Sequence, residues 1–480
     1  MHSRLRYASL AVAVLAAFAF RFWIHSIGTR IVDNASPRFI TQVPRGERRP
    51  PARTASPAVK AASPEPSPVA RTQPVGNAGP RSQGTAARPP AVPLQNPPEI
   101  VRAVYITSWS AGIPSRIDYL IDLHKTTEIN AAVIDIKDYS GYIAYQTAVP
   151  WAAEYRATRV TVRDIDALVS RLHKEGIYAI ARITVFQDPI LAHTRPDLAV
   201  HRQSLLGKGE RAPLSRDSLW LDRKGLAWID PASRPAWDYI AAIAKDAAAH
   251  GFDEINFDYV RFPSDGDLND VYYPSWDGKT PKHAVLKKFF SYLRQQLPGV
   301  KLSVDLFGLS TVNEDELGIG QIIEDAYASF DAVCPMVYPS HFARNFRGYP
   351  NPAEHPYEVV NYAIRHAAER LDRFNDPPAA SATANVAAVK PHADSTPAPA
   401  AATAGTPQPP SDARQNHPAS NVKLRPWLQD FNLGAKYDAK MVEAEIKAVK
   451  DAMGEHYAGY MIWNPTNVYT RDALKPAAKP

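Results

Sequence analysis

From Glu99 onward, segments with the composition of β-strands alternate with segments that have the apolar spacing of helices. Strands that alternate with helices form a parallel sheet with right-handed crossovers. Eight such repeats favour a closed (β/α)8 TIM barrel, an α/β fold, over an open doubly wound sheet. We expect the strands at 101–107, 130–136, 178–185, 254–260, 301–307, 332–338, 424–430 and 459–463. We expect the helices at 116–125, 164–175, 235–250, 284–297, 320–327, 356–371 and 438–453.

Two proline-rich segments do not fit this pattern. Fifteen prolines lie between Pro37 and Pro98, and nine more between Pro377 and Pro418. Neither segment has an apolar periodicity that would offset its ordering entropy. We therefore expect a disordered Pro/Ala/Arg-rich linker at 34–98 and a low-complexity insertion at about 376–420. The insertion interrupts a barrel of residues 99–475 between its sixth helix and seventh strand, a connection on the barrel face away from the chemistry.

Residues 1–33 have the features of an export signal. Arg4 and Arg6 precede a 14-residue apolar run from Tyr7 to Phe20 that only Ser9 interrupts. A basic region followed by an apolar region is typical of a signal anchor or a signal peptide. We expect a cell-envelope protein, anchored in the inner membrane and facing the periplasm, or secreted if the signal is cleaved. A buried N-terminal helix is the alternative.

The net charge of +6 is unevenly distributed. Residues 1–98 carry +10, so the rest of the chain sums to −4 and the basic pI belongs to the N-terminal tail. A nucleic-acid partner is therefore not expected. The single cysteine, Cys334, excludes an intrachain disulfide and a CxxC-type zinc site. His193, His341 and His355 show no ligand spacing, so we expect neither a metal nor a cofactor.

Carboxylates, aromatic rings and amides gather where the expected strands end. In a barrel, functional side chains lie at these carboxyl ends. Several carboxylates with aromatic rings are what carbohydrate chemistry requires, and no GxSxG or HExxH motif is present. The candidates at the strand ends are Trp109, Asp135, Asp138, Arg182, Asp258, Arg261, Asp305, Tyr338, His341, Gln429, Asp430, Trp463 and Asn464.

The segment 252–263 is the most informative of these. Alternation places Ile255, Phe257 and Tyr259 on one face and Asn256, Asp258 and Val260 on the other. If the polar face points into the barrel, Asp258 lies near the end of the strand. Arg261 would then keep this carboxylate ionised, as a nucleophile requires. The alternative is a structural Asp–Arg pair.

Several motifs resemble the bacterial "putative glycosyl hydrolase domain" family, formerly a domain of unknown function. They are IDIKDYSGYIAY, INFDYVRFPSDG, SVDLFG, CPMVYPSHF and MIWNP, in this order. The resemblance covers about residues 100–475 without the insertion, and implies a TIM barrel of the amylase-like glycosidase group. It maps the nucleophile onto Asp258. The general acid maps onto Asp305, where amylase-like enzymes have a glutamate, or onto Asp430.

Other candidates have a functional and a structural interpretation. Asp135 and Asp138 form a sugar-hydroxyl clamp, or Lys137 between them pairs with a neighbour. Lys137 and Arg182 are also candidates for contact with a carboxylated sugar. His341 binds a sugar hydroxyl or is a loop histidine. Three aromatic residues are sugar platforms or core residues: Tyr338, Trp427 and Trp463.

Together these features predict a glycoside hydrolase that acts on a polysaccharide or glycan of the bacterial envelope or its surroundings. Asp258 would be the nucleophile and Asp305 the general acid/base of a retaining mechanism. The alternatives are a non-catalytic carbohydrate-binding or envelope scaffold protein, and a metal-dependent deacetylase. Burial of Asp305 in a salt bridge would favour the binding protein. The sugar, the linkage, retention against inversion, endo against exo action and the oligomeric state stay open.

Overall fold

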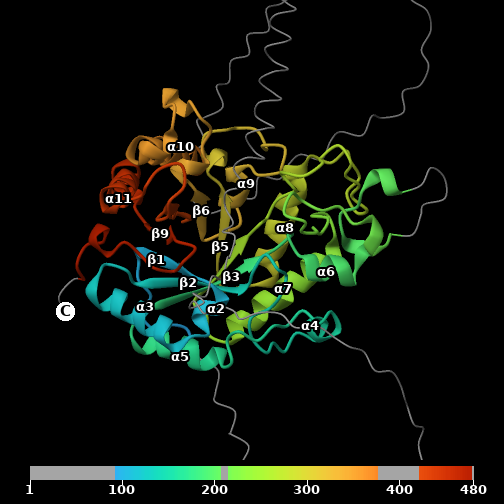
Figure 1. Ribbon diagram of the computed structural model, residues 1–480, viewed down its shortest axis with the longest axis horizontal. Coiled ribbons are helices and arrows are strands. Elements are labelled where there is room, and N and C mark those ends of the chain that lie inside the picture. Colours follow the sequence, from blue (N-terminus) through green and yellow to red (C-terminus); the bar gives the residue numbers. More distant parts are fainter. Residues whose placement is uncertain (1–91, 207–213, 377–420, 478–480) are drawn as a thin grey trace, which may run out of the picture. The chain divides into compact units, whose positions relative to one another are not determined.

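The computed structural model describes residues 92–206, 214–376 and 421–477, and these residues form a parallel β-barrel surrounded by helices (Figure 1). β1 pairs with β2 and β9, and β5 pairs with β4 and β6, so the sheet closes on itself. The expected (β/α)8 TIM barrel is confirmed. The strands are β1 (Val101–Ile106), β2 (Ala131–Lys137), β3 (Tyr178–Thr184), β4 (Glu254–Asp258), β5 (Lys301–Phe307), β6 (Ala332–Met336), β7 (Lys423–Leu424), β8 (Trp427–Gln429) and β9 (Gly459–Trp463).

β7 and β8 occupy one strand position of the barrel. Val333 of β6 pairs with Leu424 of β7, and Met336 of β6 pairs with Trp427 of β8. Pro426 lies between the two short strands and has no N–H to donate to the ladder. The strand expected at 424–430 is therefore split in two.

The main helices lie outside the ring of strands (Figure 1). Three of the helices begin at a capping aspartate. Asp164 accepts from the Ala167 amide at 2.8 Å, Asp188 from the Leu191 amide at 2.9 Å and Asp438 from the Met441 amide at 3.1 Å. The helices are α2 (Ser108–Ala111), α3 (Pro114–Thr126), α4 (Pro150–Glu154), α5 (Ile165–Lys174), α6 (Pro189–Thr194), α7 (Arg234–Ala249), α8 (Lys282–Gln296), α9 (Ile323–Tyr327), α10 (Pro356–Asn375) and α11 (Ala439–Met453).

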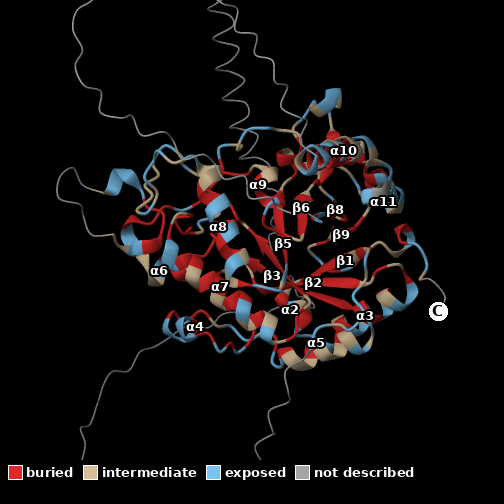
Figure 2. Cartoon of the chain, turned by 180° about the vertical axis from the view of Figure 1, so that it is seen from behind, coloured by how far each residue is buried: buried red, intermediate tan, exposed pale blue. Residues whose placement is uncertain are grey.

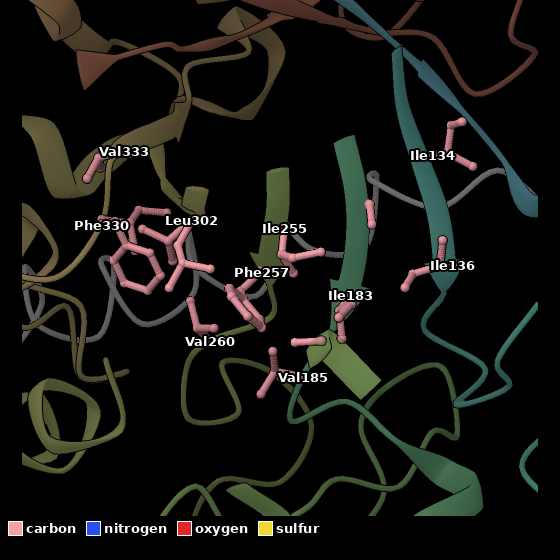
Figure 3. Packing of buried hydrophobic residues seen from close by; sticks show 14 of the residues in the cluster. Ile134, Ile136, Ile183, Val185, Ile255, Phe257, Val260, Leu302, Phe330 and Val333 are labelled. Carbon is pink, nitrogen blue, oxygen red and sulfur yellow. The ribbon is translucent and has the colours of Figure 1, made fainter. Parts of the chain in front are cut away.

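Side-chain alternation along the strands separates two apolar clusters. The larger cluster lies between strands and helices, and Figure 3 shows part of it, including Ile255 and Phe257 of β4. The smaller cluster fills the barrel interior and includes Val133, Ile180 and Met461. In Figure 2 the strands are buried, whereas the helices carry buried and exposed residues on different faces. Inward-facing polar side chains are thus surrounded by apolar groups.

Two long segments follow β3 and β4 at the carboxyl end of the barrel. The first is 185–233, whose described residues include α6 and three short 3-10 helices, and the second is 259–281. They contact each other through a bridge between His201 and Tyr272. Both segments therefore add residues to the barrel end where function is expected.

The linker and the signal region lie in residues 1–91, outside the described residues, apart from the linker's last residues. Among the described residues, none of the helices is long and apolar enough to cross a membrane. Almost all of the expected insertion lies in 377–420, also outside the described part. α10 ends at Asn375 and β7 begins at Lys423, so this segment joins the barrel at the amino end of the strands.

Candidate active site

Arg182 of β3 joins three carboxylates inside the barrel. Its Nη1 donates to Oδ1 of Asp135 at 2.5 Å, and its Nη2 donates to Oδ2 of Asp258. Its Nε lies 3.6 Å from Oδ2 of Asp305. The three aspartates come from β2, β4 and β5, and Arg182 is only 5% exposed. Parallel strands in register bring these groups together, because Asp135 pairs with Arg182 and Thr184 pairs with Asp258.

The two carboxyl oxygens of Asp305 differ in their hydrogen bonds. Oδ1 accepts hydrogen bonds from Nδ2 of Asn256 at 2.9 Å and from Nε1 of Trp427 at 2.8 Å. Oδ2 is buried and has no hydrogen-bond partner in the described part of the chain. Burial, together with the charge of Asp258, raises the pKa of Asp305 to about 8, although Arg182 acts in the opposite direction. The raised pKa favours the protonated form of Asp305, and Oδ2 is the carboxyl oxygen that accepts no hydrogen bond from a described residue.

Asp258 is held by donors on both of its carboxyl oxygens. Oδ2 accepts from Arg182, and Oδ1 accepts from the Tyr259 amide at 2.6 Å. A guanidinium and an amide both complement a carboxylate. Asp258 and Asp305 thus differ in surroundings although one guanidinium contacts both. Such a difference between two neighbouring carboxyls is what separates an acid from a nucleophile.

Asp135 completes the cluster on the β2 side. Its Oδ2 accepts from the Tyr105 hydroxyl, and burial raises its pKa to about 6 against the opposing charge of Arg182. The Tyr105 ring stacks on Trp463 with 3.8 Å between ring centroids. Trp427 meets Trp463 edge to face at 5.7 Å. Aromatic rings therefore border the carboxylates; Tyr105 and Trp427 are buried members of the inner apolar cluster, and Trp463 is partly exposed.

The expected alternation in 252–263 holds only as far as Asp258. Asn256 and Asp258 point into the barrel as predicted, since both bond to other inward groups. Tyr259 then has φ = +54°, a left-handed conformation that interrupts the two-residue period. Val260 consequently packs in the outer cluster, where Figure 3 shows it, and not beside Asp258. Its predicted position was wrong.

The predicted contact between Arg261 and Asp258 was also wrong. Arg261 forms no ion pair with any described residue, and its Nη1 donates to the Phe262 carbonyl at 3.2 Å and to Oγ of Ser264 at 3.0 Å. The guanidinium that contacts Asp258 belongs to Arg182. The turn at Tyr259 explains the difference, because it changes the direction of the chain before Arg261 is reached.

Lys137 and Asp138 follow Asp135 but do not join the cluster. Nζ of Lys137 donates to the Thr184 carbonyl at 2.7 Å and lies 3.0 Å from Oδ2 of Asp188, with both side chains fully buried. The ion-pair interpretation of Lys137 is the one that the structure supports. Oδ1 of Asp138 accepts from the Ser140 amide at 2.9 Å and thereby shapes the following turn.

Tyr338 and His341 lie together after β6, with 5.1 Å between ring centroids. The charges of Asp305 and Asp258 contribute to raising the pKa of Tyr338, after burial, so Tyr338 lies near the carboxylates. Burial lowers the pKa of His341 to about 4, so this ring is neutral at pH 7. Nε2 of His341 is buried and has no partner among the described residues.

Asp430 and Asn464 build the chain turns near the carboxyl end of β9. Asp430 accepts from the Thr470 amide at 2.8 Å and from the Thr470 hydroxyl at 2.7 Å. Asn464 donates to the Asp430 carbonyl and accepts from the Thr466 amide at 2.9 Å. Asp430, the competing general acid, thus has its carboxylate engaged by Thr470.

Three members of the cluster were not singled out as site residues: Tyr105, Asn256 and, as a hydrogen-bond donor, Trp427. The signal that could have found them is the alternation of side chains along the strands. A tyrosine or asparagine that points into the barrel meets an inward-pointing aspartate of the neighbouring strand. In the part of the chain that the structure describes, no three His, Cys, Asp or Glu side chains are placed to hold a metal ion.

A family model described as "Putative glycosyl hydrolase domain" matches residues 103–382 and 406–469. No curated protein matches the chain. Among solved structures, a hypothetical protein from Ruminiclostridium thermocellum ATCC 27405 is 35% identical, with 45% of this chain and 98% of that chain covered and a TM-score of 0.38. The PgaB (BpsB) glycoside hydrolase domain from Bordetella bronchiseptica is 14% identical, with 78% and 99% covered and a TM-score of 0.46. A beta-N-acetylhexosaminidase from Bacteroides fragilis NCTC 9343 is 8% identical, with 80% and 67% covered and a TM-score of 0.41.

Proposed function

The chain belongs to the putative glycosyl hydrolase domain family, and on this basis we propose that it is a glycoside hydrolase with Asp258 and Asp305 as its catalytic pair. One observation carries the proposal: Arg182 contacts both carboxyls, yet their surroundings differ. Asp305 is buried with a raised pKa, whereas Asp258 has donors on both oxygens. These are the two states that a glycosidase requires at one pH.

The proposed reaction is a double displacement. Asp305 gives the proton on Oδ2 to the glycosidic oxygen as its bond to the anomeric carbon breaks, and the Asp258 carboxylate bonds to that carbon. Asp305, now ionised, then takes a proton from water while the water oxygen displaces Asp258. Arg182 positions both carboxyls, and Trp463 offers a partly exposed ring beside them.

Hydrolysis by the full chain tests this proposal. Reducing-sugar release is measured on a panel of bacterial and plant polysaccharides, with Asp258→Asn, Asp305→Asn and the control Asp472→Asn, which changes an exposed carboxylate. We expect Asp258→Asn to abolish release and Asp472→Asn to leave it unchanged. Asp305→Asn should lower the rate by roughly 10²–10⁴-fold. Its effect should be smaller on aryl glycosides, whose leaving groups need little protonation.

The stereochemistry of the first product tests the role of Asp258. Proton NMR of the newly formed anomer should show retention. Activity that survives Asp258→Asn, or a first product of inverted configuration, would contradict Asp258 as the nucleophile.

A specific observation favours a second candidate, a non-catalytic carbohydrate-binding protein. Asp305 is only 1% exposed and lies within ion-pair distance of Arg182, the arrangement expected of a structural group. The raised pKa of Asp305 argues in the other direction, because an ion pair that dominated would lower it. Tight binding of a polysaccharide without release of any sugar would support this second function.

We also propose that the substrate is a glycan of the bacterial envelope or its surroundings, and that the N-terminal segment anchors the protein in the inner membrane. The basic and apolar segments of residues 1–33 support this location. Fractionation of cells that express the full chain should recover it with the inner membrane, accessible to protease only from the periplasm. Recovery from the cytosol would contradict it.

A further inference from the structure

Arg261 is a buried cation without a carboxylate in contact. It is 3% exposed, and none of the described acidic residues lies within ion-pair distance of its guanidinium. Arg182 of β3, by contrast, contacts three carboxylates. Burying an unpaired charge costs several kcal/mol in general, so such a group usually has a partner. The buried charge of Arg261 therefore lacks the carboxylate partners that Arg182 has.

Aromatic rings and two hydrogen bonds fix the orientation of this guanidinium. Its central carbon lies 4.7 Å from the ring centroid of Trp228, 4.8 Å from that of Phe307 and 5.2 Å from that of Tyr259. Nη1 donates to the Phe262 carbonyl and to Ser264. Cation–π contacts of this kind hold a guanidinium without neutralising its charge. Arg261 is thus held in place but keeps its positive charge.

The remaining donors of Arg261 lie on one edge of the guanidinium. Nε and Nη2 donate to no other described residue, and neither is fully buried without a partner, so both keep some contact with solvent. Their N–H bonds point in parallel, the geometry that binds two oxygens of one carboxylate. Arg195 of this chain shows the same use of this edge: its Nε and Nη2 lie 2.9 and 2.6 Å from the two carboxyl oxygens of Asp197.

The charges around Arg261 also favour an anion with a single negative charge. Burial lowers the pKa of Arg261, and Asp222, Asp258 and Asp265 lie close enough to offset part of this shift without contacting it. A dianion would be repelled by these carboxylates. A single carboxylate would satisfy both free donors and neutralise the guanidinium.

Arg261 lies beside the proposed catalytic pair. The charge of Asp258 acts on Arg261. Phe307, whose ring centroid lies 4.8 Å from the guanidinium carbon, follows Asp305 by two residues at the end of β5. A sugar substituent at Arg261 therefore belongs to the same substrate as the bond between the two carboxyls.

We propose that the Nε/Nη2 edge of Arg261 binds the carboxylate of a uronic acid, so that the substrate is an acidic polysaccharide. This inference rests on the proposed function, because it names the substrate class of that site. Lys137 and Arg182, the cations that the sequence suggested for this role, are both engaged by carboxylates of the protein.

Binding by the full chain tests the inference independently of catalysis. The probes are trimers of galacturonic, glucuronic and mannuronic acid, each with its counterpart in which the carboxyl groups are reduced to hydroxymethyl. Calorimetry measures the affinities, and chromatography of the same samples detects cleavage. At least one uronate trimer should bind about tenfold or more tightly than its reduced counterpart.

Arg261→Lys keeps the charge but removes the paired donors, and should lower this preference about tenfold. The matched control is Arg234→Lys, because Arg234 also stacks on an aromatic ring, that of Tyr292 at 3.8 Å, but is largely exposed. It should leave the preference unchanged. Thermal unfolding of each variant verifies that it is folded.

The inference would be overturned by equal affinity for uronate and reduced trimers, or by no binding at all. It would also be overturned by a preference that survives Arg261→Lys, or by tighter binding of phosphorylated or sulfated trimers. A uronate preference that depends on Arg261, without cleavage of any glycan, supports the inference while the proposed hydrolase function fails. If the protein cleaves only neutral polysaccharides and Arg261→Lys leaves this cleavage unchanged, the proposed hydrolase function stands and the inference about uronic acids fails.

Discussion

Asp305→Asn should make the protein less sensitive to pH in its stability, besides lowering its activity. In the folded protein, burial raises the pKa of Asp305 to about 8, whereas an ordinary aspartate in the unfolded chain has a pKa near 3.8. Because the folded state binds the extra proton, the contribution of Asp305 to stability is present below about pH 4 and is lost as pH rises to about 8.

The magnitude follows from this difference in bound protons. Each pH unit inside the window changes the free energy of unfolding by about 1.4 kcal/mol per proton. Between pH 5 and pH 7 the free energy of unfolding of the wild type should therefore fall by about 3 kcal/mol relative to that of Asp305→Asn. The amide oxygen of asparagine keeps the acceptor for Asn256 and Trp427, so the variant mimics the protonated acid.

Urea unfolding of the full chain, followed by tryptophan fluorescence at pH 5, 6 and 7, measures this difference. Asp472→Asn is the control, since its carboxylate is exposed, and its stability should run parallel to that of the wild type. If wild type and Asp305→Asn also run parallel between pH 5 and 7, Asp305 is ionised in the folded protein. It then cannot act as the general acid at neutral pH.

Three further changes test neighbouring contacts. Trp427→Phe removes a hydrogen bond that favours the charged form of Asp305. The alkaline limb of the pH–rate profile should therefore move to higher pH by about one unit or less. A shift to lower pH would contradict the assigned bond. Gly141→Ala should lower the free energy of unfolding in urea by about 1–3 kcal/mol or more. Gly141 has φ = +85°, and a Cβ there would lie 2.3 Å from Oδ1 of Asp188. An unchanged midpoint of urea unfolding would refute this. Lys137→Met should cost about 3–5 kcal/mol in the same assay by leaving Asp188 buried and unpaired, and the double variant with Asp188→Leu should recover part of that loss.

The strands could be predicted because their apolar runs and the intervening helical periods are local properties. All eight strand positions were found within a few residues of their expected bounds. The seventh position was expected as one strand, and only the register against β6 shows how Pro426 divides it. Local patterns thus fix which residues form strands, whereas pairing decides where each strand stops.

The candidate site could be predicted only in part. Asp258 and Asp305 followed from their positions at strand ends and from the family resemblance. The central role of Arg182 depends on contacts with residues 47 and 76 positions away along the chain, which no local pattern encodes. The separate position of Arg261 depends on one backbone angle at Tyr259, and a tyrosine gives no sequence signal for a left-handed conformation.

The left-handed tyrosine at the end of β4 also has a consequence for the evolution of the protein. A non-glycine residue in this conformation costs of order 1 kcal/mol or more, and the rest of the fold must outweigh that strain. Selection for thermal stability alone should therefore replace Tyr259 by glycine or asparagine, which adopt the conformation more readily. Such a replacement would also remove one of the rings that hold Arg261. Stability and substrate recognition are thus expected to compete at this one position, so that lineages under strong thermal selection would have to find their stability elsewhere in the barrel.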